Sequence, residues 1–459
     1  TADGIYLYFS NSEISDNHLE NISSDGIQAG SYSTPTITDN TLENITSNGI
    51  KLESGNNTVI TGNTLSNTDN GIYLGDGDNA VITGNSISTA SGHGIYLANG
   101  NDAQILSNSI ETCSQKAIYL YQYCVNTVID SNTISGNSYG IYLDQYNDNV
   151  EITNNQITNN SSSYGICLYQ NNDNVEIIGN DISNNSSYGL YIESALNKNL
   201  LIRSNVIKDH TSNGILFNHY SYGDVIENII INNGNAGIYF NNAYSGDCDV
   251  RNNTIDGHSN SGLYWNSENS GSYTLKAVNN SITNNGFGIY CHNGSSYNTI
   301  RHNNSWNNSS GNYEGDLPSG TGNLTDINLN GNVSDIYYNI SENPLYTNPD
   351  NEDFTLQTGS PNIDAGDPNY NDIDATVADI GAIPVLQQVP IIQITGNIIG
   401  GVDFEKPDYA DYEDDQYQDR MTSNIWITRK NSQGIYNAYS QSGYDCGYCG
   451  PEGTEWHWG

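Results

Sequence analysis

The apolar residues of this 459-residue chain fall in short bursts of alternating apolar and polar positions, and the bursts recur with a fixed period. The clearest burst is Gly71-Ile72-Tyr73-Leu74, in which a small residue precedes an apolar–any–apolar triplet. Relatives of this tetrapeptide recur at intervals of 22 to 26 residues, beginning at Gly4, Gly26, Gly49, Gly71, Gly94, Ala117, Gly140, Gly165, Gly189, Gly214, Gly237, Gly262 and Gly288. Such a period predicts a solenoid, in which each repeat buries its apolar face only against its neighbours.

Each period holds three such bursts, separated by clusters of Asn, Asp, Ser and Gly. The alternation indicates strands, and helical spacing of apolar residues is absent, while the polar clusters supply turns. A leucine-rich repeat has a similar period but requires a regular leucine spacing and a helix, and neither is present. The sequence therefore predicts an all-β fold, a single-stranded parallel β-helix with about 13 regular coils.

A second periodic position holds asparagine, two residues before an Ile or Leu. It comprises Asn17, Asn40, Asn63, Asn85, Asn108, Asn132, Asn155, Asn180, Asn205, Asn228, Asn253 and Asn280. Stacked asparagines hydrogen-bond along the solenoid axis and tolerate the left-handed backbone conformation of turns. With these two motifs, residues 1–385 resemble the right-handed parallel β-helix proteins of secreted and surface type. The resemblance implies the fold and its right-handedness, but it implies no single activity, because lyases, epimerases, adhesins and passive scaffolds share this architecture.

The C-terminal third divides further. Residues 343–384 contain Asn343-Pro344-Leu345-Tyr346, Ser360-Pro361-Asn362-Ile363-Asp364-Ala365-Gly366-Asp367-Pro368 and Asp379-Ile380-Gly381-Ala382. They resemble the closing segment of secreted β-helix proteins and are expected to form the last coils and cap the core. Residues after 385 resemble the start of an uncharacterised β-rich domain. We therefore expect regular coils in 1–310, closing coils in 311–386 and an incomplete β-rich domain in 387–459, with the chain cut at both ends.

The composition is compatible with an exported protein and argues against some classes of partner. The chain carries 52 acidic and 12 basic residues, a net charge of −40. So acidic a surface opposes binding of nucleic acid, anionic membranes and polyanionic sugars. The sequence contains no apolar run of 18 residues that would span a bilayer. We predict an extracellular or cell-surface protein whose partners are other secreted or surface proteins, or a glycan. Sequons such as those at Asn21, Asn44, Asn252, Asn332 and Asn339 add possible N-glycosylation.

The exposed side of the tetrapeptide strand is the predicted binding face. Ile and Leu point inwards, so the residue between them points outwards. Tyr fills this position in nine of thirteen repeats: Tyr6, Tyr73, Tyr96, Tyr119, Tyr142, Tyr191, Tyr239, Tyr264 and Tyr290. The next outward position holds, among others, Tyr8, Tyr121, Asp144, Tyr169 and Glu193. The predicted partner- or glycan-binding residues are Tyr73, Tyr96, Tyr119, Tyr121, Tyr142, Asp144, Tyr169, Tyr191 and Glu193.

Three interpretations of this face stay open. Tyrosine rings stack on sugar faces while carboxylates accept hydroxyl hydrogen bonds. An aromatic strip also suits a protein partner or a neighbouring subunit. Finally, the rings stabilise a parallel sheet by packing on one another along the ladder.

The main functional hypothesis is a surface scaffold or adhesin-like module, and the alternative is a polysaccharide lyase or epimerase. Such an enzyme needs a base and a group that neutralises the uronate carboxylate. The basic residues of the solenoid look scattered along the sequence: Lys51, Lys116, Lys198, Arg203, Lys208, Arg251, Lys276 and Arg301. We expect no pair of coils to gather a base, a cation and a carboxylate, and we assign no catalytic residue. Asp144 and Glu193, as a hydrolytic pair, stand two coils apart.

No cofactor is required by this hypothesis, but one loop is a candidate calcium site. Asp364, Asp367, Asp372 and Asp374 lie among glycines and turn-forming residues. Ca²⁺ takes six to eight hard oxygen ligands. The spacing does not match the helix–loop–helix calcium motif, and aspartates also form turns without any metal.

Seven cysteines complete the inventory. Cys446 and Cys449 are predicted to form a small disulfide, because no second Cys pair or His pair supports zinc. Cys113 and Cys124 flank one tetrapeptide and are candidates for a second bridge. Cys291 lies at a core position and is expected to be buried.

Overall fold

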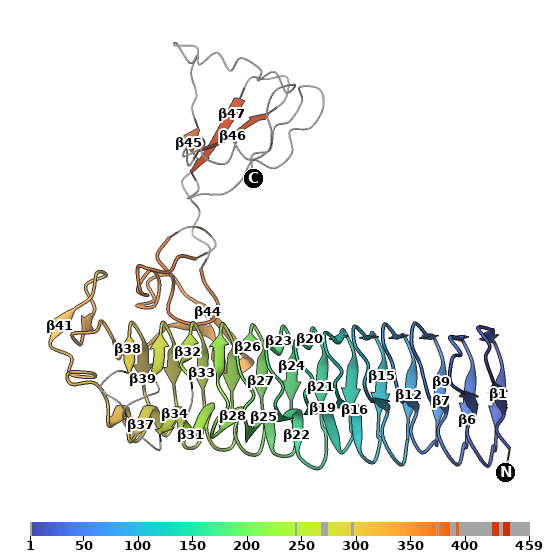
Figure 1. Cartoon of the computed structure of the whole chain (residues 1–459). Helices are drawn as coiled ribbons and strands as arrows, with labels where there is room; N and C mark the ends of the chain where they lie inside the picture. Colours follow the sequence, from blue (N-terminus) through green and yellow to red (C-terminus); the bar gives the residue numbers. More distant parts are fainter. Residues whose placement is uncertain are drawn as a thin grey trace. The chain divides into compact units, whose positions relative to one another are not determined.

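A computed structural model describes residues 2–243, 246–267, 274–294, 298–372, 374, 376–385, 392–393, 425–430 and 435–440. The chain forms two units, one of Thr1–Asp367 with Ala378–Pro384 and one of Pro368–Val377 with Val385–Gly459. The first unit is a parallel β-solenoid, whose coils stack along one axis (Figure 1). Within the described residues there is no α-helix, only one 3-10 turn, η1 (Pro349–Asn351), and no helix could span a membrane.

Each coil contributes one strand to each of three parallel sheets, which we call A, B and C. Sheet A contains the tetrapeptide strands: β1 (Ile5–Leu7), β4 (Ile27–Ala29), β7 (Ile50–Leu52), β10 (Ile72–Leu74), β13 (Ile95–Leu97), β16 (Lys116–Gln122), β19 (Tyr139–Gln145), β22 (Tyr164–Gln170), β25 (Tyr188–Ala195), β28 (Ile215–Asn218), β31 (Ile238–Ala243), β34 (Ser261–Ser267), β37 (Phe287–His292) and β40 (Gly311–Gly315).

Sheets B and C hold the other two strands of each coil. Sheet B consists of β2 (Glu13–Ser15), β5 (Thr36–Thr38), β8 (Val59–Thr61), β11 (Val81–Thr83), β14 (Gln104–Leu106), β17 (Val128–Asp130), β20 (Glu151–Thr153), β23 (Glu176–Ile178), β26 (Leu200–Arg203), β29 (Gly223–Ile226), β32 (Cys248–Arg251), β35 (Leu275–Val278) and β38 (Thr299–Arg301). Sheet C consists of β3 (His18–Glu20), β6 (Thr41–Glu43), β9 (Thr64–Ser66), β12 (Ser86–Ser88), β15 (Ser109–Glu111), β18 (Thr133–Ser135), β21 (Gln156–Thr158), β24 (Asp181–Ser183), β27 (Val206–Lys208), β30 (Ile229–Ile231), β33 (Thr254–Asp256), β36 (Ser281–Thr283) and β39 (Asn304–Trp306).

The core is a stack of identical or similar residues, because each strand pairs in register with its counterpart in the next coil. Ile72 and Leu74 pair with Ile95 and Leu97, and all four are fully buried. Towards the C-terminal end the stack becomes aromatic, with Phe217 and Phe240 rings 4.7 Å apart and Trp265 beyond them. The predicted fold class is confirmed.

The glycine that opens each tetrapeptide is required by close approach and not by its φ angle. A Cβ atom on Gly71 would lie 2.5 Å from the Ile87 Cγ2 atom and 2.6 Å from the carbonyl oxygen of Gly94. The small size demanded by this position is therefore a packing constraint between sheet C and the next coil.

The predicted asparagine ladder is present, buried, and longer than expected. The side-chain oxygen of each member accepts the backbone N–H and the Nδ2 amide of the asparagine one coil earlier; between Asn63 and Asn85 both distances are close to 3 Å, at 3.0 and 2.9 Å. Asn303 and Asn339 extend the ladder beyond Asn280. The left-handed conformation was expected at these asparagines, but it lies one residue earlier, as at Asp39 and Asn154.

A second ladder runs through the turn between sheets C and A in the later coils. Its members are Asn137, Asn160, Asn185, His210, Asn233, His258, Asn285 and Asn308. His210 accepts the backbone N–H of Asn185 at Nδ1, 3.1 Å away, and its Nε2 lies 3.0 Å from the carbonyl oxygen of Ile182. The imidazole therefore replaces an asparagine amide, with one acceptor and one donor nitrogen.

The end of the core is closed by residues at the start of the expected closing segment, 311–386. Tyr313 and Leu317 pack against the core, and the Tyr313 hydroxyl donates to the carbonyl oxygens of Asn303 and Ile340. The next part of the chain forms two antiparallel hairpins, β41 (Asp326–Ile327) with β42 (Val333–Ser334) and β43 (Tyr346–Asn348) with β44 (Asp353–Leu356).

The described part of residues 343–384 in the first unit packs on the outside of sheet C and does not cap the core. Tyr346 and Asn362 bond to the Ser281 hydroxyl, and the backbone N–H of Ala382 donates to Thr254 at 3.0 Å. Small polar residues on the outer side of β33 and β36 provide these acceptors, which explains the sideways docking. The domain boundaries at 310 and 386 stay a prediction.

The second unit contains one small antiparallel sheet among its described residues. Its strands are β45 (Ile392–Gln393), β46 (Ile425–Lys430) and β47 (Ile435–Ser440), in the order β45-β47-β46. Cys446 and Cys449 lie outside the described residues, so their disulfide stays a prediction.

Candidate functional site

The outer face of sheet A carries the predicted row of tyrosines. Tyr73 pairs in register with Tyr96, Tyr96 with Tyr119, and Tyr119 with Tyr142. We call these four residues and Tyr191 the tyrosine row. Its rings contact one another from coil to coil, with centroids 4.7, 5.3 and 5.6 Å apart from Tyr73 to Tyr142. The prediction that these tyrosines lie side by side on one outer face is confirmed.

Carboxylates hold the hydroxyl ends of the row. The Tyr119 hydroxyl donates to Asp144 Oδ2 at 2.7 Å, and the Tyr191 hydroxyl donates to Glu193 Oε2 at 2.6 Å. Tyr121 and Tyr169 extend the aromatic surface beside the row, 6.0 Å from Tyr96 and 6.2 Å from Tyr142 respectively. Every residue of the predicted binding face therefore lies on the outer side of sheet A.

Two basic residues, Lys116 and His93, lie over this aromatic surface. The Lys116 Nζ atom is 4.1 Å from the ring centroid of Tyr119 and 4.7 Å from that of Tyr142. These are cation–π distances. The His93 ring lies 4.9 Å from the Tyr119 ring. With these neighbours Tyr119 is only 9% exposed, so the row is partly covered by its own surroundings.

Burial shifts the pKa of several titratable groups on this surface. It raises the pKa of the Tyr96 hydroxyl to about 12, with the neighbouring tyrosines adding to the effect. Burial and then the bond to the adjacent carboxylate raise the pKa of Tyr119 and of Tyr191. Burial lowers the pKa of His93 to about 4, assisted by Lys116. At neutral pH the hydroxyls of Tyr96, Tyr119 and Tyr191 are therefore protonated donors, and His93 is uncharged.

Cys167 interrupts the tyrosine row. It occupies the row position between Tyr142 and Tyr191 and is buried beneath neighbouring rings. Burial raises the pKa of its thiol well above the ordinary value, with the charge of Glu193 contributing in the same direction. The thiol is thus neutral and packs as a small apolar group.

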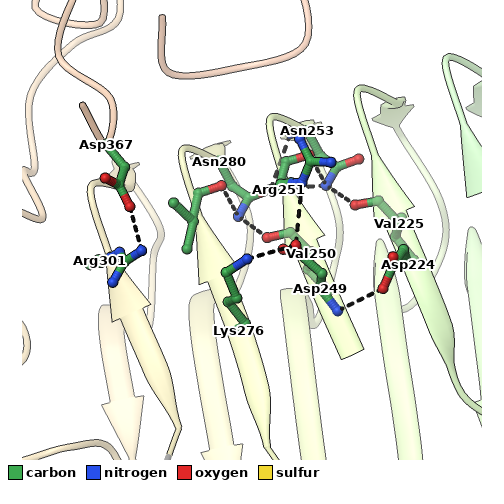
Figure 2. Close-up of polar contacts among 11 residues, drawn as sticks. Asp224, Val225, Asp249, Val250, Arg251, Asn253, Lys276, Asn280, Arg301 and Asp367 are labelled. Carbon is green, nitrogen blue, oxygen red and sulfur yellow. Dashed lines mark hydrogen bonds and ion pairs between the residues drawn. The ribbon is translucent and has the colours of Figure 1, made fainter. Parts of the chain in front are cut away.

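The later coils bring together residues that look scattered in sequence. Figure 2 shows Arg251, Lys276 and Arg301 on the outer side of sheet B, with Asp224, Asp249 and Asp367; we call these six residues the ionic cluster. Lys276 Nζ lies 2.8 Å from Asp249 Oδ2, Arg251 Nε lies 3.3 Å from the same oxygen, and Arg301 pairs with Asp367 at 2.5 Å.

The expectation that no coils gather a base, a cation and a carboxylate is therefore wrong. Lys276 pairs with Asp249 of the preceding strand, and Arg251 and Arg301 both pair with Val278 between them, so the three cations fall on neighbouring strands. Their charges are balanced within the cluster, because three cations face three aspartates. Burial, followed by the repulsion of Asp249, raises the pKa of Asp224.

Comparison with known families decides what the solenoid is. The model of the family described as "Right handed beta helix region" matches residues 3–157 and 145–305, which is most of the chain. The chain belongs to the right-handed β-helix family. The resemblance of the closing segment to secreted β-helix proteins stays a prediction.

Several solved β-helix structures are similar in fold. Pectate lyase Pel9A is 12% identical, with a TM-score of 0.47 over 76% of this chain and 88% of its own. The periplasmic alginate epimerase AlgG is 13% identical, with a TM-score of 0.37 over 62% of this chain and 78% of its own. The A-module of the Azotobacter vinelandii mannuronan C-5 epimerase AlgE4 is 15% identical, with a TM-score of 0.36 over 68% and 89%. At these identities the similarity concerns the fold alone. No curated protein matches the sequence.

The candidate calcium ligands of this β-helix protein are engaged in protein contacts. Asp367 pairs with Arg301, and the Asp374 carboxylate accepts from the backbone and hydroxyl of Thr376 at 3.1 and 2.9 Å. The backbone N–H of Asp372 donates to the carbonyl oxygen of Thr376. Across the described ranges, no three His, Cys, Asp or Glu side chains lie close enough to hold a metal ion. Calcium stays a prediction.

The second proposed disulfide is wrong. Cys113 and Cys124 are both buried and free, as are Cys167, Cys248 and Cys291. Cys113 lies in the turn before β16 and Cys124 in the turn after it, so the whole width of sheet A separates them. The expectation that Cys291 is buried in the core is confirmed.

Sequence reasoning missed a second column of this face. Tyr139, Tyr164 and Tyr188 follow Lys116 in consecutive coils, and the Tyr164 ring stacks on Tyr191 at 4.4 Å. Each of these tyrosines directly precedes the small residue that opens its tetrapeptide. The recurring tyrosine was therefore visible in the sequence, one position before the tetrapeptide motif.

Proposed function

We propose that this β-helix is an exported surface module that binds a neutral glycan on the outer face of sheet A, without turning it over. The observation that carries the proposal is the tyrosine row itself, in which protonated hydroxyls and two carboxylates alternate with ring faces over consecutive coils. Aromatic faces suit the C–H faces of sugars, and the polar ends suit their hydroxyls.

The titration behaviour favours binding over catalysis at this face. A general base must be deprotonated near the working pH. The raised pKa values of Tyr119, Tyr142 and Tyr191 keep these hydroxyls protonated, so none of them takes a proton from a substrate. They act as hydrogen-bond donors.

The charge of the protein selects the kind of glycan. A net charge of −40 repels polyanions at long range. On the binding face itself, Asp144 and Glu193 add two negative groups beside the cation of Lys116, and Lys51 pairs with Tyr73 at the end of the row. A neutral polysaccharide is therefore the ligand class that this surface suits, and export follows from the acidity and from the resemblance to surface proteins.

The experiment is a glycan array with the full chain, followed by a product assay on every glycan that binds. We expect retention of neutral glycans and no released product. An Asp144→Asn/Glu193→Gln variant removes acceptor charge without changing shape and should bind about tenfold more weakly, a loss near 1.4 kcal/mol. Glu111→Gln/Glu151→Gln, on the exposed faces of the other two sheets, is the matched control and should bind as the wild type does. Capture of a protein and of no glycan would overturn the proposal.

The ionic cluster favours a second candidate function, a lyase acting on a uronate polymer. It is the one place in the described part of sheet B where we find lysine, arginines and carboxylates on neighbouring coils (Figure 2). Against this candidate, Lys276 donates to Asp249, so its amine is engaged. Incubation with polygalacturonate and alginate, read as near-ultraviolet absorption of unsaturated products, decides it. Turnover that disappears in Lys276→Met would establish the lyase.

A further inference from the structure

Bulky residues adopt a left-handed backbone conformation in the turn that follows sheet A. Tyr123 and Tyr146 have φ angles of 52° and 57°, and Phe9 and Tyr32 have φ angles of 51° and 65°. Such angles are unfavourable for residues with a large side chain and are normally left to Gly, Asn and Asp. Each of these aromatic residues therefore costs the fold some stability.

The neighbouring coils show that the backbone does not need an aromatic residue here. Asn99 and Asn171 stand at the same turn position in the coils on either side, with φ angles of 49° and 51°. The backbone N–H groups of Asn99 and Tyr123 make the equivalent bond, to the carbonyl oxygens of Gln122 and Gln145 in the following coil. Asparagine is thus sufficient for the turn.

Packing does not account for the rings either. Tyr123 is 52% exposed and Tyr146 is 41% exposed, so a substantial part of each side chain remains in solvent. Tyr338, a left-handed tyrosine outside this turn, is 42% exposed, and its ring is stacked on His302, 5.1 Å away. Strain without compensating burial, at positions where a better residue exists, indicates a role outside the fold.

The arrangement of the rings shows what that role is. The Tyr123 and Tyr146 rings are parallel within 7° with centroids 5.3 Å apart, and Phe9 and Tyr32 repeat this geometry at 9° and 5.3 Å. Each pair forms an exposed stack of two aromatic rings spanning two coils, which we call a platform. Next to the first platform, Gln122, Gln145 and Gln170 form a row of side-chain amides, with Gln145 donating to Gln170 at 3.2 Å.

We infer that the Tyr123–Tyr146 platform binds the pyranose rings of a neutral polysaccharide by stacking, while the glutamine amides bond to its hydroxyls. The inference rests on the proposed glycan function and locates its principal contact in the turn beside the tyrosine row. Flat rings match the C–H faces of a pyranose, and uncharged amides match hydroxyls without selecting an anion. Phe9 and Tyr32 form an equivalent platform on the first two coils.

The test is affinity electrophoresis of the full chain in gels that contain glucomannan, xyloglucan, xylan or arabinogalactan, with polygalacturonate as the anionic comparison. The variant is Tyr123→Asn/Tyr146→Asn, which copies the residue of the flanking coils. We expect at least a tenfold loss of affinity for the neutral polysaccharide that retards the wild type, at an unchanged or higher melting temperature. Tyr123→Phe/Tyr146→Phe keeps the rings and should keep the affinity.

Tyr338→Asn is the matched control, because it removes a left-handed tyrosine away from the platform and should leave affinity unchanged. If the double asparagine variant is retarded as strongly as the wild type, the inference is overturned and the proposed function stands. If no neutral polysaccharide retards the wild type, the proposed function fails and the inference fails with it. Should the double variant melt at a lower temperature, the affinity of the single variant Tyr146→Asn is compared with that of the wild type instead, and an unchanged affinity overturns the inference.

Discussion

The side-chain amide of Asn339 donates to the carboxylate of Asp335 at 3.0 Å, and this contact ends the asparagine ladder on an acidic group. Along the ladder each asparagine donates its backbone N–H and an Nδ2 proton to the asparagine of the following coil, so the last asparagine needs an acceptor that is not another asparagine. Asp335 is fully buried and also accepts the backbone N–H groups of Gly322, Tyr337 and Asn339. A carboxylate suits this end because it accepts hydrogen bonds only.

Replacing Asp335 should therefore destabilise the C-terminal coils. Asp335→Ala leaves several buried N–H donors without their acceptor and should cost about 3 kcal/mol. Asp335→Asn restores one acceptor oxygen but turns an NH₂ group towards other donors, and should cost about half as much. Chemical denaturation measures both, with the exposed Asp326→Asn as the control that should change little. Equal stability of wild type and Asp335→Ala would refute this account of the ladder end.

The buried histidines of the second ladder should make stability depend on pH. Burial lowers the pKa of His210 and of His258 to about 4, whereas in the unfolded chain a histidine titrates near 6.5. Between these values the unfolded state binds more protons, so stability is complete above pH 6.5 and falls as the pH drops towards 4. Each histidine should contribute a loss of about 2–3 kcal/mol over this range.

The measurement is denaturation at pH 7.5 and at pH 4.5. In His210→Asn/His258→Asn, asparagine copies the residue of the flanking coils and should remove the part of the loss that these two imidazoles cause, while the part from His93 stays. The exposed His18→Asn is the control and should follow the wild type. If all three proteins lose the same free energy on acidification, the buried imidazoles are not responsible.

The two kinds of glycine in a coil should respond oppositely to substitution. Gly71→Ala places a Cβ atom 2.5 Å from Ile87 and against the backbone of the next coil, and should cost about 1–3 kcal/mol. Gly84 has a φ angle of 63°, and a Cβ atom there meets nothing closer than 4.0 Å. Because Asn154 and Asn252 hold the equivalent position with the same backbone, Gly84→Asn should be neutral or stabilising. Thermal melting of both variants checks these two predictions. An unchanged melting temperature for Gly71→Ala would contradict the packing constraint at this glycine.

Calcium binding by the acidic segment is a prediction with its own measurement. If Asp364, Asp367, Asp372 and Asp374 hold Ca²⁺, adding millimolar calcium after EGTA treatment should raise the melting temperature. At a calcium concentration 100 times the dissociation constant, the free energy of unfolding should increase by about 2.7 kcal/mol. The rise should be absent in Asp372→Asn/Asp374→Asn. Identical midpoints for wild type with EGTA and with calcium would end the idea.

The fold could be predicted from the sequence because its two strongest signals are periodic. Gly71 and Asn63 recur once per coil, and a coil has only one way to bury its Ile and Leu residues against the next. The tyrosine row followed from the same periodicity, since outward positions alternate with Ile72 and Leu74. The ionic cluster was missed because the period was counted for apolar residues and not for charges, and because coils of unequal length bring Arg251, Lys276 and Arg301 together.

Other features depend on information that a repeat does not carry. Nothing in the sequence indicates that Tyr346 and Asn362 dock on the side of sheet C, because that contact joins segments 65 and 81 residues from Ser281. The strain at Tyr123 and Tyr146 is likewise invisible until backbone angles are known. Sequence patterns therefore predict the features that recur in every coil, whereas features confined to one or two coils become visible only in the structure.

At the turn after sheet A, the side chain exposed to solvent can change without changing the backbone conformation that the fold needs. Since asparagine and tyrosine occupy this position with the same backbone, a few nucleotide changes in one codon can exchange them while the solenoid is left intact. Duplication of a coil would then extend the displayed surface by a fixed step of about 4.8 Å. A lineage carrying such a protein can alter its ligand one coil at a time, with the core as an unchanging template.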